Sequence, residues 1–586
     1  MRLINIKLFL EREQIMSTGG RADRRTKVLE FRDDEATPYA ILSHRWIEPT
    51  EVDYEEMVDL AKIDEKERDE IRGRFGYMKI LDTCEQAKRD GYEWVWVDTC
   101  CIDKRSSAEL SEAINSMYRW YGNAKVCYTY LHDVHGTFFP TEEDHEQYSN
   151  SNGWPEWFLR GWTLQEMIAP SNVQFFNDGW QFIGDKKTLS LTLSKITRVP
   201  QRILTEGLAR NRPCVAQIMS WAADRTTTRV EDRAYSLMGL LDVNMPMLYG
   251  EGKKAFRRLQ LEIIRSSNDQ SIFAWGWDQT RVRTGSILAD DPSFFKDCSY
   301  MELMDYVEFV KHFKRYTPAD ELPSFDQDCF GIFPITNRGI QIWMLLTPYR
   351  NSDSVFTAWL PCRDPSWGPP VRIDLVLWHN NHYRYPSMSE FPTEKPLQFR
   401  QVYLQYQDAL DHDMTFEIDD GLFTENGFTC TDVYPSKFTG NIVTVTSANP
   451  LHVRTYSERQ GNGHFAVVFG QSFNRDWIYC INDPSSQFSS VDEGKLLVMG
   501  PKRAHSMADA PSQNDDCDRV WVYHSQLPGS TWIVRTSRVV WERLRIGVRM
   551  EVFLDSRFRD GLDEWKIFDI EVSNFLVLPM DHCDYA

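Results

Sequence analysis

The run Trp94-Val95-Trp96-Val97 leads without a break into the polar residues from Asp98 to Lys104. Four bulky apolar residues in a row are typical of a strand buried on both faces, and are too few for a helix. Apolar residues recur at helical spacing on either side of this run, from Tyr77 to Ala87 and from Leu110 to Tyr121. The pattern predicts a strand between two helices, the unit from which open α/β sheets are built.

Three further strands are expected at Tyr39–Leu42, Val126–Leu131 and Val173–Phe176. Strands that alternate with helices predict a mainly parallel α/β sheet, and such sheets bind ligands outside the carboxyl ends of their strands. Ser43 to Trp46 directly follow the first strand, and Asp98 to Lys104 directly follow the second. We therefore expect these two loops to converge at one edge of the sheet.

The stretch from Trp154 to Pro170 contains three tryptophans, an arginine and two glutamates. It is predicted as a single helix, because Pro155 suits a first helical turn and the residue before Pro170 is pushed out of the α region. Glu166 would then lie on the last turn, beside the apolar face. Two interpretations stay open: a carboxylate of a site for a cationic or ribosyl substrate, and a solvated carboxylate at the end of a helix.

The sequence predicts that the whole chain divides into three parts. Residues 1–210 form the predicted α/β domain, and residues 211–280 are predicted as a helical extension of it, with apolar residues at helical spacing between 213 and 268. From 281 to 586, short alternating or β-branched runs separated by turn residues predict a β-rich domain of the sandwich or barrel-like kind.

Composition excludes several classes of protein. The 586 residues carry a net charge of −20, which argues against a general nucleic-acid binder. The 12 cysteines show no CxxC pair and no zinc-type spacing, so we expect reduced thiols, with Cys100 and Cys101 buried, and no metal site. No apolar run approaches the ~20 residues that a membrane span needs, and the N-terminus lacks a signal peptide. We expect a cytoplasmic protein without a bound cofactor.

Several of these runs together resemble a known family. The resemblance rests on four blocks, Tyr39–Trp46, Trp96–Lys104, Ala113–Tyr118 and Arg160–Glu166, followed by Asp232–Leu240 and the Leu248–Gly252 turn. In this order they resemble the signature blocks of the fungal HET (heterokaryon incompatibility) domain and the segment that often follows it. The resemblance covers about the first half of the chain.

The HET domain is in turn similar to the TIR domain, a flavodoxin-like α/β fold. TIR domains that cleave NAD carry a glutamate in a Trp-Cys-x-x-Glu-like helix, and Trp162 to Glu166 match this pattern with Thr163 in place of cysteine. The TIR Ser-Phe-Arg corresponds loosely to Ser43-His44-Arg45. The resemblance implies a role in non-self recognition and programmed cell death, and NAD(P)⁺ glycohydrolase chemistry with NAD as substrate.

On this hypothesis Glu166 is the catalytic candidate, because a carboxylate stabilises the oxocarbenium character that develops at the ribose. The candidate binding residues are Ser43, Arg45, Trp46, Asp98 and Trp162. Each also has an ordinary structural interpretation: Arg45 could pair with the acidic segment 48–59, Ser43 could cap its own turn, and Asp98 could order residues 99–103 through an Asx turn.

The second hypothesis is a non-enzymatic adaptor, in which the HET domain self-associates and the β-rich half recognises an unknown protein partner. Both hypotheses predict a homo-oligomer. Three remaining residues receive ordinary interpretations: Arg160 as an i,i+4 partner of Glu156, and His379 and His382 as surface residues.

Overall fold

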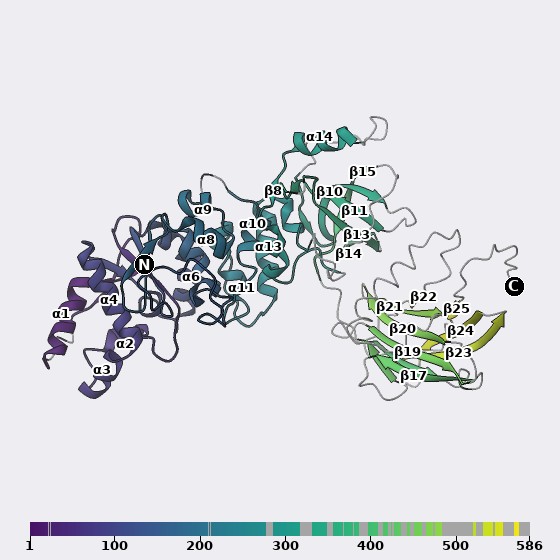
Figure 1. Cartoon of the computed structure of the whole chain (residues 1–586), viewed down its shortest axis with the longest axis horizontal. Coiled ribbons are helices and arrows are strands. Elements are labelled where there is room, and N and C mark those ends of the chain that lie inside the picture. Colours follow the sequence, from purple (N-terminus) through teal and green to yellow (C-terminus); the bar gives the residue numbers. More distant parts are fainter. Residues whose placement is uncertain are drawn as a thin grey trace.

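A computed structural model gives the arrangement of the chain (Figure 1). It describes residues 1–276 except 21–22, 24, 209 and 211, then 285–316, 331–348 and 355–407 with short gaps at 367, 379 and 386–396. Beyond residue 407 it describes mainly strands, the last of which ends at Val572.

The N-terminal sheet has seven strands in the order β2-β1-β4-β3-β5-β6-β7. Their bounds are Arg2–Asn5 (β1), Leu29–Phe31 (β2), Ala40–His44 (β3), Trp94–Trp96 (β4), Val126–Tyr130 (β5), Val173–Phe176 (β6) and Phe182–Asp185 (β7). The four predicted strands are β3, β4, β5 and β6, and they are parallel to one another. The mainly parallel α/β sheet is therefore confirmed, with antiparallel strands added at both sides.

The crossover helices explain why the order of strands reverses beside β3. Helix α4 (Phe75–Arg89) leads from β3 to β4, and α6 (Ser107–Asn123) leads back across β3 to β5. Right-handed crossovers in opposite directions place the two helices on opposite faces of the sheet. Helix α1 (Ile6–Ser17) packs against α4, whereas α6 contacts α7 (Thr163–Ile168). The reversal point, between β3 and β5, is where open sheets of this kind bind ligands.

The stretch from 154 to 170 is not the single helix that the sequence predicts. It forms a 3-10 turn, η1 (Glu156–Leu159), and then the short helix α7. Arg160 is extended between them, and the Gly161 N–H donates to Thr226 O at 2.8 Å. A segment that is distant in the sequence thus satisfies the backbone N–H at the break. As a result, Glu166 lies on the first turn of α7 rather than on the last turn of a long helix.

The charged segment 51–72 folds as two short helices. They are α2 (Tyr54–Asp59) and α3 (Glu65–Arg72). At the start of α6, a capping box is only half formed. Ser106 accepts the Glu109 N–H, but the Glu109 carboxylate turns to Arg2 and to the Asp103 N–H instead.

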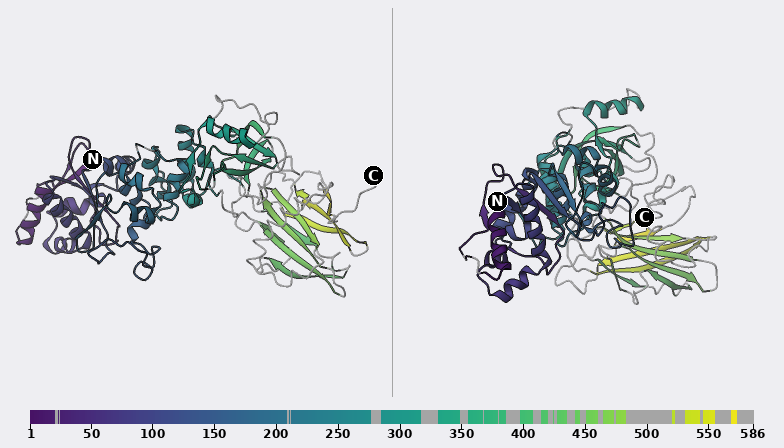
Figure 2. Two further views of the ribbon diagram at one scale, coloured as in Figure 1. Left: turned by 45° about the horizontal axis from the view of Figure 1, so that its top comes forward. Right: turned by 60° about the vertical axis from the view of Figure 1, so that its left-hand side comes forward.

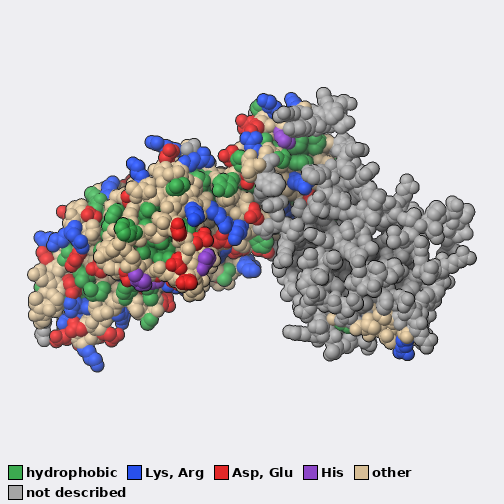
Figure 3. Space-filling view, in the orientation of Figure 1, with side chains coloured by type: hydrophobic (Ala, Val, Ile, Leu, Met, Phe, Trp, Pro, Cys, Tyr) green, Lys and Arg blue, Asp and Glu red, His purple; other side chains and the backbone are tan. Residues whose placement is uncertain are grey.

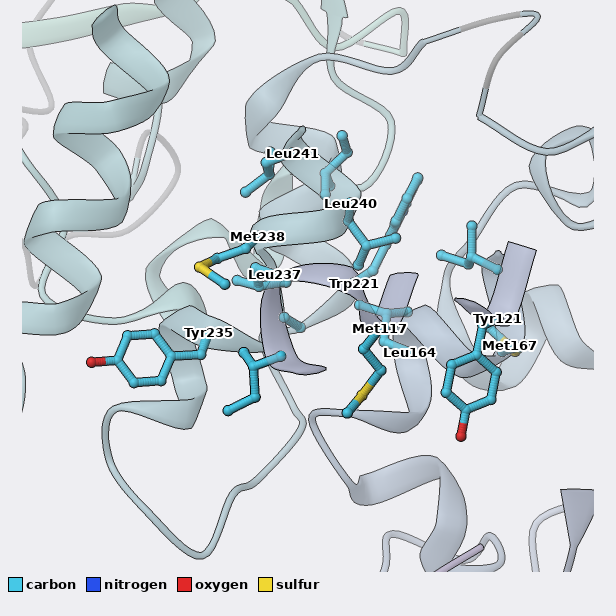
Figure 4. Packing of buried hydrophobic residues seen from close by; sticks show 14 of the residues in the cluster. Met117, Tyr121, Leu164, Met167, Trp221, Tyr235, Leu237, Met238, Leu240 and Leu241 are labelled. Atoms are coloured by element: carbon cyan, nitrogen blue, oxygen red, sulfur yellow. The ribbon is translucent and has the colours of Figure 1, made fainter. Parts of the chain in front are cut away.

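The helical segment packs onto the face of α6 and α7. Its helices are α10 (Val215–Trp221), α11 (Asp232–Tyr235), α12 (Met238–Leu241) and α13 (Lys254–Ser266). Helices α8 (Ser190–Thr197) and α9 (Gln201–Glu206) precede it, within residues 1–210. In Figure 4, Leu240 and Trp221 lie close to Leu164 of α7 and Met117 of α6. The contact is close: a Cβ at Gly239 would lie 2.2 Å from the Tyr118 Cβ. The boundaries at 210 and 280 stay predictions.

The later chain is rich in strands, as predicted. After the 3-10 turns η2 (Gln270–Phe273) and η3 (Pro292–Cys298) and helix α14 (Tyr306–Tyr316), strands β10, β11, β13, β14 and β15 close into a ring through the pairing of β10 with β11. Two five-stranded sheets follow, β18-β16-β23-β24-β25 and β17-β19-β20-β21-β22. Figure 2 shows these two sheets stacked, apart from the N-terminal part.

The described strands of this part of the chain have the following bounds. They are Glu302–Leu303 (β8), Ile335–Thr336 (β9), Gly339–Pro348 (β10), Val355–Trp359 (β11), Cys362–Arg363 (β12), Arg372–Trp378 (β13), Asn381–Tyr385 (β14), Gln398–Leu404 (β15), Met414–Asp419 (β16), Phe428–Tyr434 (β17), Ile442–Val445 (β18), Leu451–Glu458 (β19), His464–Ser472 (β20), Arg475–Asn482 (β21), Val520–Val522 (β22), Thr531–Glu542 (β23), Arg545–Leu554 (β24) and Phe568–Val572 (β25).

The prediction that His382 is a surface residue is wrong. Its side chain is 4% exposed inside the ring, where burial lowers its pKa to about 4. His379 and residues 505–518 lie outside the described residues.

On the face shown in Figure 3, acidic and basic side chains are interspersed over the described part of the chain. None of the described helices combines the length and apolar character that crossing a bilayer requires.

Candidate functional site

Ser43 and Glu166 meet at the carboxyl edge of the sheet. Ser43 is the last residue but one of the buried strand β3, and its Oγ donates to Glu166 Oε2 at 2.5 Å. The same Oγ accepts the indole N–H of Trp157 at 2.8 Å, so the hydroxyl is held from both sides. All three side chains are buried, with Glu166 only 5% exposed. Glu166 is therefore not the solvated carboxylate that one interpretation of the sequence proposed.

The surroundings of Glu166 favour its neutral form. Burial, together with the Asp98 carboxylate, raises the pKa of Glu166 to about 8, although the hydrogen bond from Ser43 opposes the shift. A carboxyl group with this pKa is largely protonated at neutral pH. A positive charge placed beside it would restore its ionisation, because opposite charge favours the charged form.

The loops after β3 and β4 converge, as the sequence predicts. The Trp46 indole N–H donates to Asp98 Oδ2 at 2.7 Å, and Lys104 Nζ lies 3.5 Å from the centre of the Trp46 ring. Asp98 begins the short helix α5 (Asp98–Cys101) and accepts no backbone N–H, so the predicted Asx turn is wrong. Its second oxygen lies 3.8 Å from His44 Nε2.

His44 extends this cluster into the core. It is buried, and its Nε2 lies 3.6 Å from Glu51 Oε2. Lys79 Nζ holds the other Glu51 oxygen at 2.7 Å. Burial alone would raise the pKa of Glu51, but His44 and Lys79 together lower it to about 2. Glu51 is thus an ionised carboxylate that anchors the loop after β3.

Arg45 pairs with Glu156 rather than with the acidic segment 48–59. This pair replaces the predicted i,i+4 pair of Arg160 with Glu156, since Arg160 donates instead to Thr228 Oγ1 at 3.2 Å. Glu156 also lies 3.6 Å from His132, which is two residues beyond the end of β5. Arg45 is about one-third exposed (35%), so its guanidinium remains accessible at the edge of the sheet.

Trp162 belongs to a neighbouring contact. It is half-buried and hydrogen-bonds Asp232, the first residue of α11. Arg225, 4% exposed, donates to Arg160 O at 2.8 Å and to Thr163 Oγ1 at 2.9 Å. These contacts tie the break before α7 to the helical segment. Cys100 and Cys101 are buried free thiols, as expected.

Lys186 fixes the other end of α7. It is buried, and its Nζ donates to Met167 O at 3.1 Å and to Pro170 O. Burial lowers the pKa of Lys186 to about 8. The ammonium group satisfies carbonyls that a helix end leaves without partners, so it holds the helix that carries Glu166.

A hollow of about 190 Å³ lies beside η1, between that turn and the helices α8 and α10. Aromatic residues Trp154, Phe158 and Trp221 line it, together with Lys195 and Arg225. None of the six candidate site residues predicted from the sequence lines this hollow.

Several residues that contact the candidates Ser43, Asp98 and Arg45 were not predicted from the sequence. Trp157 lies within the stretch 154–170 without a signal of its own, and His44 stands between the candidates Ser43 and Arg45. His132 and Asp133 follow the third predicted strand directly, so the rule that selected Ser43 and Asp98 would also have selected them. Glu51 and Lys79 come from helical or charged segments and carry no local signal.

Comparison with known proteins identifies the N-terminal part. Residues 39–152 match the heterokaryon incompatibility protein (HET) family, and residues 254–297 match a domain of unknown function, DUF8212. The chain is 44% identical over 283 residues to the vegetative incompatibility protein HET-E-1 of Podospora anserina. This alignment covers 46% of the present chain and 19% of that relative, so the chain spans about a fifth of its length. No solved structure matches the chain.

Proposed function

We propose that this protein acts in fungal heterokaryon (vegetative) incompatibility, where non-self recognition leads to programmed cell death, because residues 39–152 match the HET family. The observation that carries this proposal is the 44% identity to a vegetative incompatibility protein over 283 residues. In this role the protein works in the cytoplasm, self-associates through the HET domain, and meets a partner through its β-rich half.

The HET domain is proposed to have a TIR-like, flavodoxin-like fold. In chain order the parallel strands β3, β4, β5 and β6 lie in the sheet as 2-1-3-4, which agrees with the flavodoxin-like order. The reversal between the first and third of these strands puts Ser43 on the edge at which such folds bind their ligands.

The chemistry proposed for this edge is hydrolysis of NAD. The bond between nicotinamide nitrogen and ribose C1′ breaks, water adds to C1′, and nicotinamide, ADP-ribose and one proton are released. Glu166 is suited to this step, because the cationic nicotinamide and the developing oxocarbenium charge would ionise a carboxyl group that is otherwise neutral. Ser43 and Trp157 then act as positioning residues, which fix the carboxylate oxygen.

The other candidate residues are given binding roles on the same edge. Arg45 supplies a guanidinium for the pyrophosphate once it leaves Glu156, since that geometry suits two phosphate oxygens. Asp98 and Trp46 supply a carboxylate for ribose hydroxyls and an exposed ring for stacking. Trp162 is half-buried and borders the site from the α11 side.

One observation favours the adaptor hypothesis instead. Glu166 is 5% exposed and hydrogen-bonded by Ser43, as a carboxyl group with a purely structural role would be. On this reading the HET domain assembles without turnover, and the Ser43–Glu166 contact only fixes α7 on the sheet.

Incubation of the full chain with NAD separates the two hypotheses. Nicotinamide release is followed at low and at high protein concentration, for wild type, Glu166→Gln and the exposed control Glu142→Gln. The enzymatic hypothesis expects release that the control keeps and Glu166→Gln loses by at least a hundredfold. Absence of release from concentrated wild type, or equal release from Glu166→Gln, would leave the adaptor.

Expression of the same three variants in a filamentous fungus tests the wider role. Cell death is scored by uptake of a membrane-impermeant dye. Death with wild type and control supports the incompatibility role, whether or not Glu166→Gln also kills. Survival with folded wild-type protein would contradict it for this chain acting alone.

A further inference from the structure

A second group of ionisable side chains lies on the same edge of the sheet. His132 and Asp133 follow β5, and Glu156 opens η1. One ligand atom from each of the three lies within 4.8 Å of the others. His132 Nε2 is 3.6 Å from Glu156 Oε2, and His132 Nδ1 is 3.8 Å from Asp133 Oδ1. The exposed fractions of the three side chains are between 18% and 25%, so the group is sheltered but reachable.

Polar atoms of this group lack hydrogen-bond partners. His132 Nδ1 and Asp133 Oδ1 are buried and form no hydrogen bond in the structure. The other Asp133 oxygen accepts the Glu156 N–H at 2.8 Å, so the carboxylate is oriented by the backbone of η1. Leaving a buried donor or acceptor unsatisfied costs roughly 1–3 kcal/mol, so these atoms favour any ligand that satisfies them.

An imidazole and two carboxylates form the kind of ligand set that Zn²⁺ and Mn²⁺ accept. Three protein ligands leave further coordination positions for water or a ligand. Two donors each about 2.1 Å from one ion, at a tetrahedral angle, are about 3.4 Å apart. The observed 3.6 Å between His132 Nε2 and Glu156 Oε2 is close to that separation. Because one imidazole binds one ion through a single ring nitrogen, Nε2 is the ligating atom of His132, and its Nδ1 faces Asp133 Oδ1.

We propose that His132, Asp133 and Glu156 form a binding site for a divalent transition-metal ion of the Zn²⁺ or Mn²⁺ type. This site goes beyond the proposed NAD chemistry and does not depend on it. The sequence predicts no metal site, because it lacks the Cys/His spacings of zinc sites, whereas these three ligands come together only in the fold.

Arg45 gives this site a distinguishing property. Its guanidinium pairs with Glu156 Oε2, the oxygen that lies nearest to His132. A metal ion at that oxygen replaces the guanidinium, because two cations compete for one lone-pair region. Metal binding therefore releases Arg45, and removing the charge of Arg45 strengthens metal binding.

The test is calorimetric titration of the metal-free full chain with ZnCl₂ and separately with MnCl₂, with the EPR signal of free Mn²⁺ as a second readout. The variants are His132→Gln, Asp133→Asn and Arg45→Gln. The control is His145→Gln, because His145 and Glu143 form an exposed pair at the same 3.6 Å. Thermal unfolding in metal-free buffer verifies that each variant is folded.

The proposal expects one equivalent bound by wild type and by the control. Affinity should fall at least tenfold in His132→Gln and Asp133→Asn, and should rise severalfold in Arg45→Gln. Lack of saturable binding to wild type by either ion overturns the site. So does binding that His132→Gln and Asp133→Asn leave unchanged, and unchanged affinity in folded Arg45→Gln removes Glu156 from the ligand set.

Discussion

Ser43 and Glu166 are 123 positions apart in the chain, yet their side chains share a 2.5 Å hydrogen bond at the carboxyl edge of the sheet. Ser43 is the last residue but one of the first parallel strand, and Glu166 lies on the helix that precedes the fourth. The bond therefore joins the centre of the sheet to the crossover that leads to β6.

The ionisation of Glu166 makes stability depend on pH. Burial raises the pKa of Glu166 to about 8, from a usual value of 4.5. Between these values the folded state holds a proton that the unfolded state has lost, so the free energy of unfolding falls as pH rises. Glu166→Gln stays neutral and should gain on wild type between pH 5 and pH 8.5, by an amount on the order of a few kcal/mol.

Denaturant unfolding at both pH values measures this gain. The exposed Glu142→Gln serves as the control and should show no such change between the two pH values. A constant difference between Glu166→Gln and wild type would mean that Glu166 titrates normally in the folded protein.

Trp157→Phe should destabilise the protein by about 1–3 kcal/mol, because the Ser43 hydroxyl loses its buried donor while most ring packing is kept. Trp46→Phe also loses an indole hydrogen bond, to Asp98, but at a ring that is 36% exposed. Its cost should stay below about 1 kcal/mol. Urea midpoints of the two variants provide the comparison. An equal loss of stability in the two variants would show that burial does not increase the contribution of the Trp157–Ser43 hydrogen bond.

Gly239→Ala should loosen the packing of α12 on α6. The added Cβ would lie 2.2 Å from the Tyr118 Cβ, an atom close to the backbone that cannot swing away. Such overpacking typically costs about 1–3 kcal/mol. Gly122→Ala is the matched control in α6, where the nearest atom is 3.8 Å away, and it should stabilise the helix by about 0.5–1 kcal/mol. Thermal midpoints that move in the same direction for both variants would contradict this account.

Lys186→Met should destabilise the protein by roughly 1–3 kcal/mol, since the carbonyls of Met167 and Pro170 lose their buried donor. The adjacent Lys187 is exposed, so Lys187→Met should change stability by less than about 0.5 kcal/mol. Hydrogen exchange of the α7 amides, compared between the two variants, localises the effect. Unchanged protection of α7 in Lys186→Met would show that the ammonium group does not hold this helix.

Much of the sheet was determined by the sequence alone, because strand and helix patterns are local. Short apolar runs such as Trp94–Val97 mark buried strands, and their alternation with helical spacing fixes a parallel sheet. That sheet brings Trp46 and Asp98 to one edge, as observed. A run of residues in one segment suffices for each of these steps.

Only the tertiary structure decided which side chains meet. The helix expected from 154 to 170 breaks at Arg160 and Gly161, because the carbonyl of Thr226, far along the chain, accepts the Gly161 N–H. The break moves Glu166 to the first turn of α7, under Ser43, and leaves Glu156 to pair with Arg45. Local periodicity carries no information on such contacts, since their free energy comes from residues that are distant in the sequence.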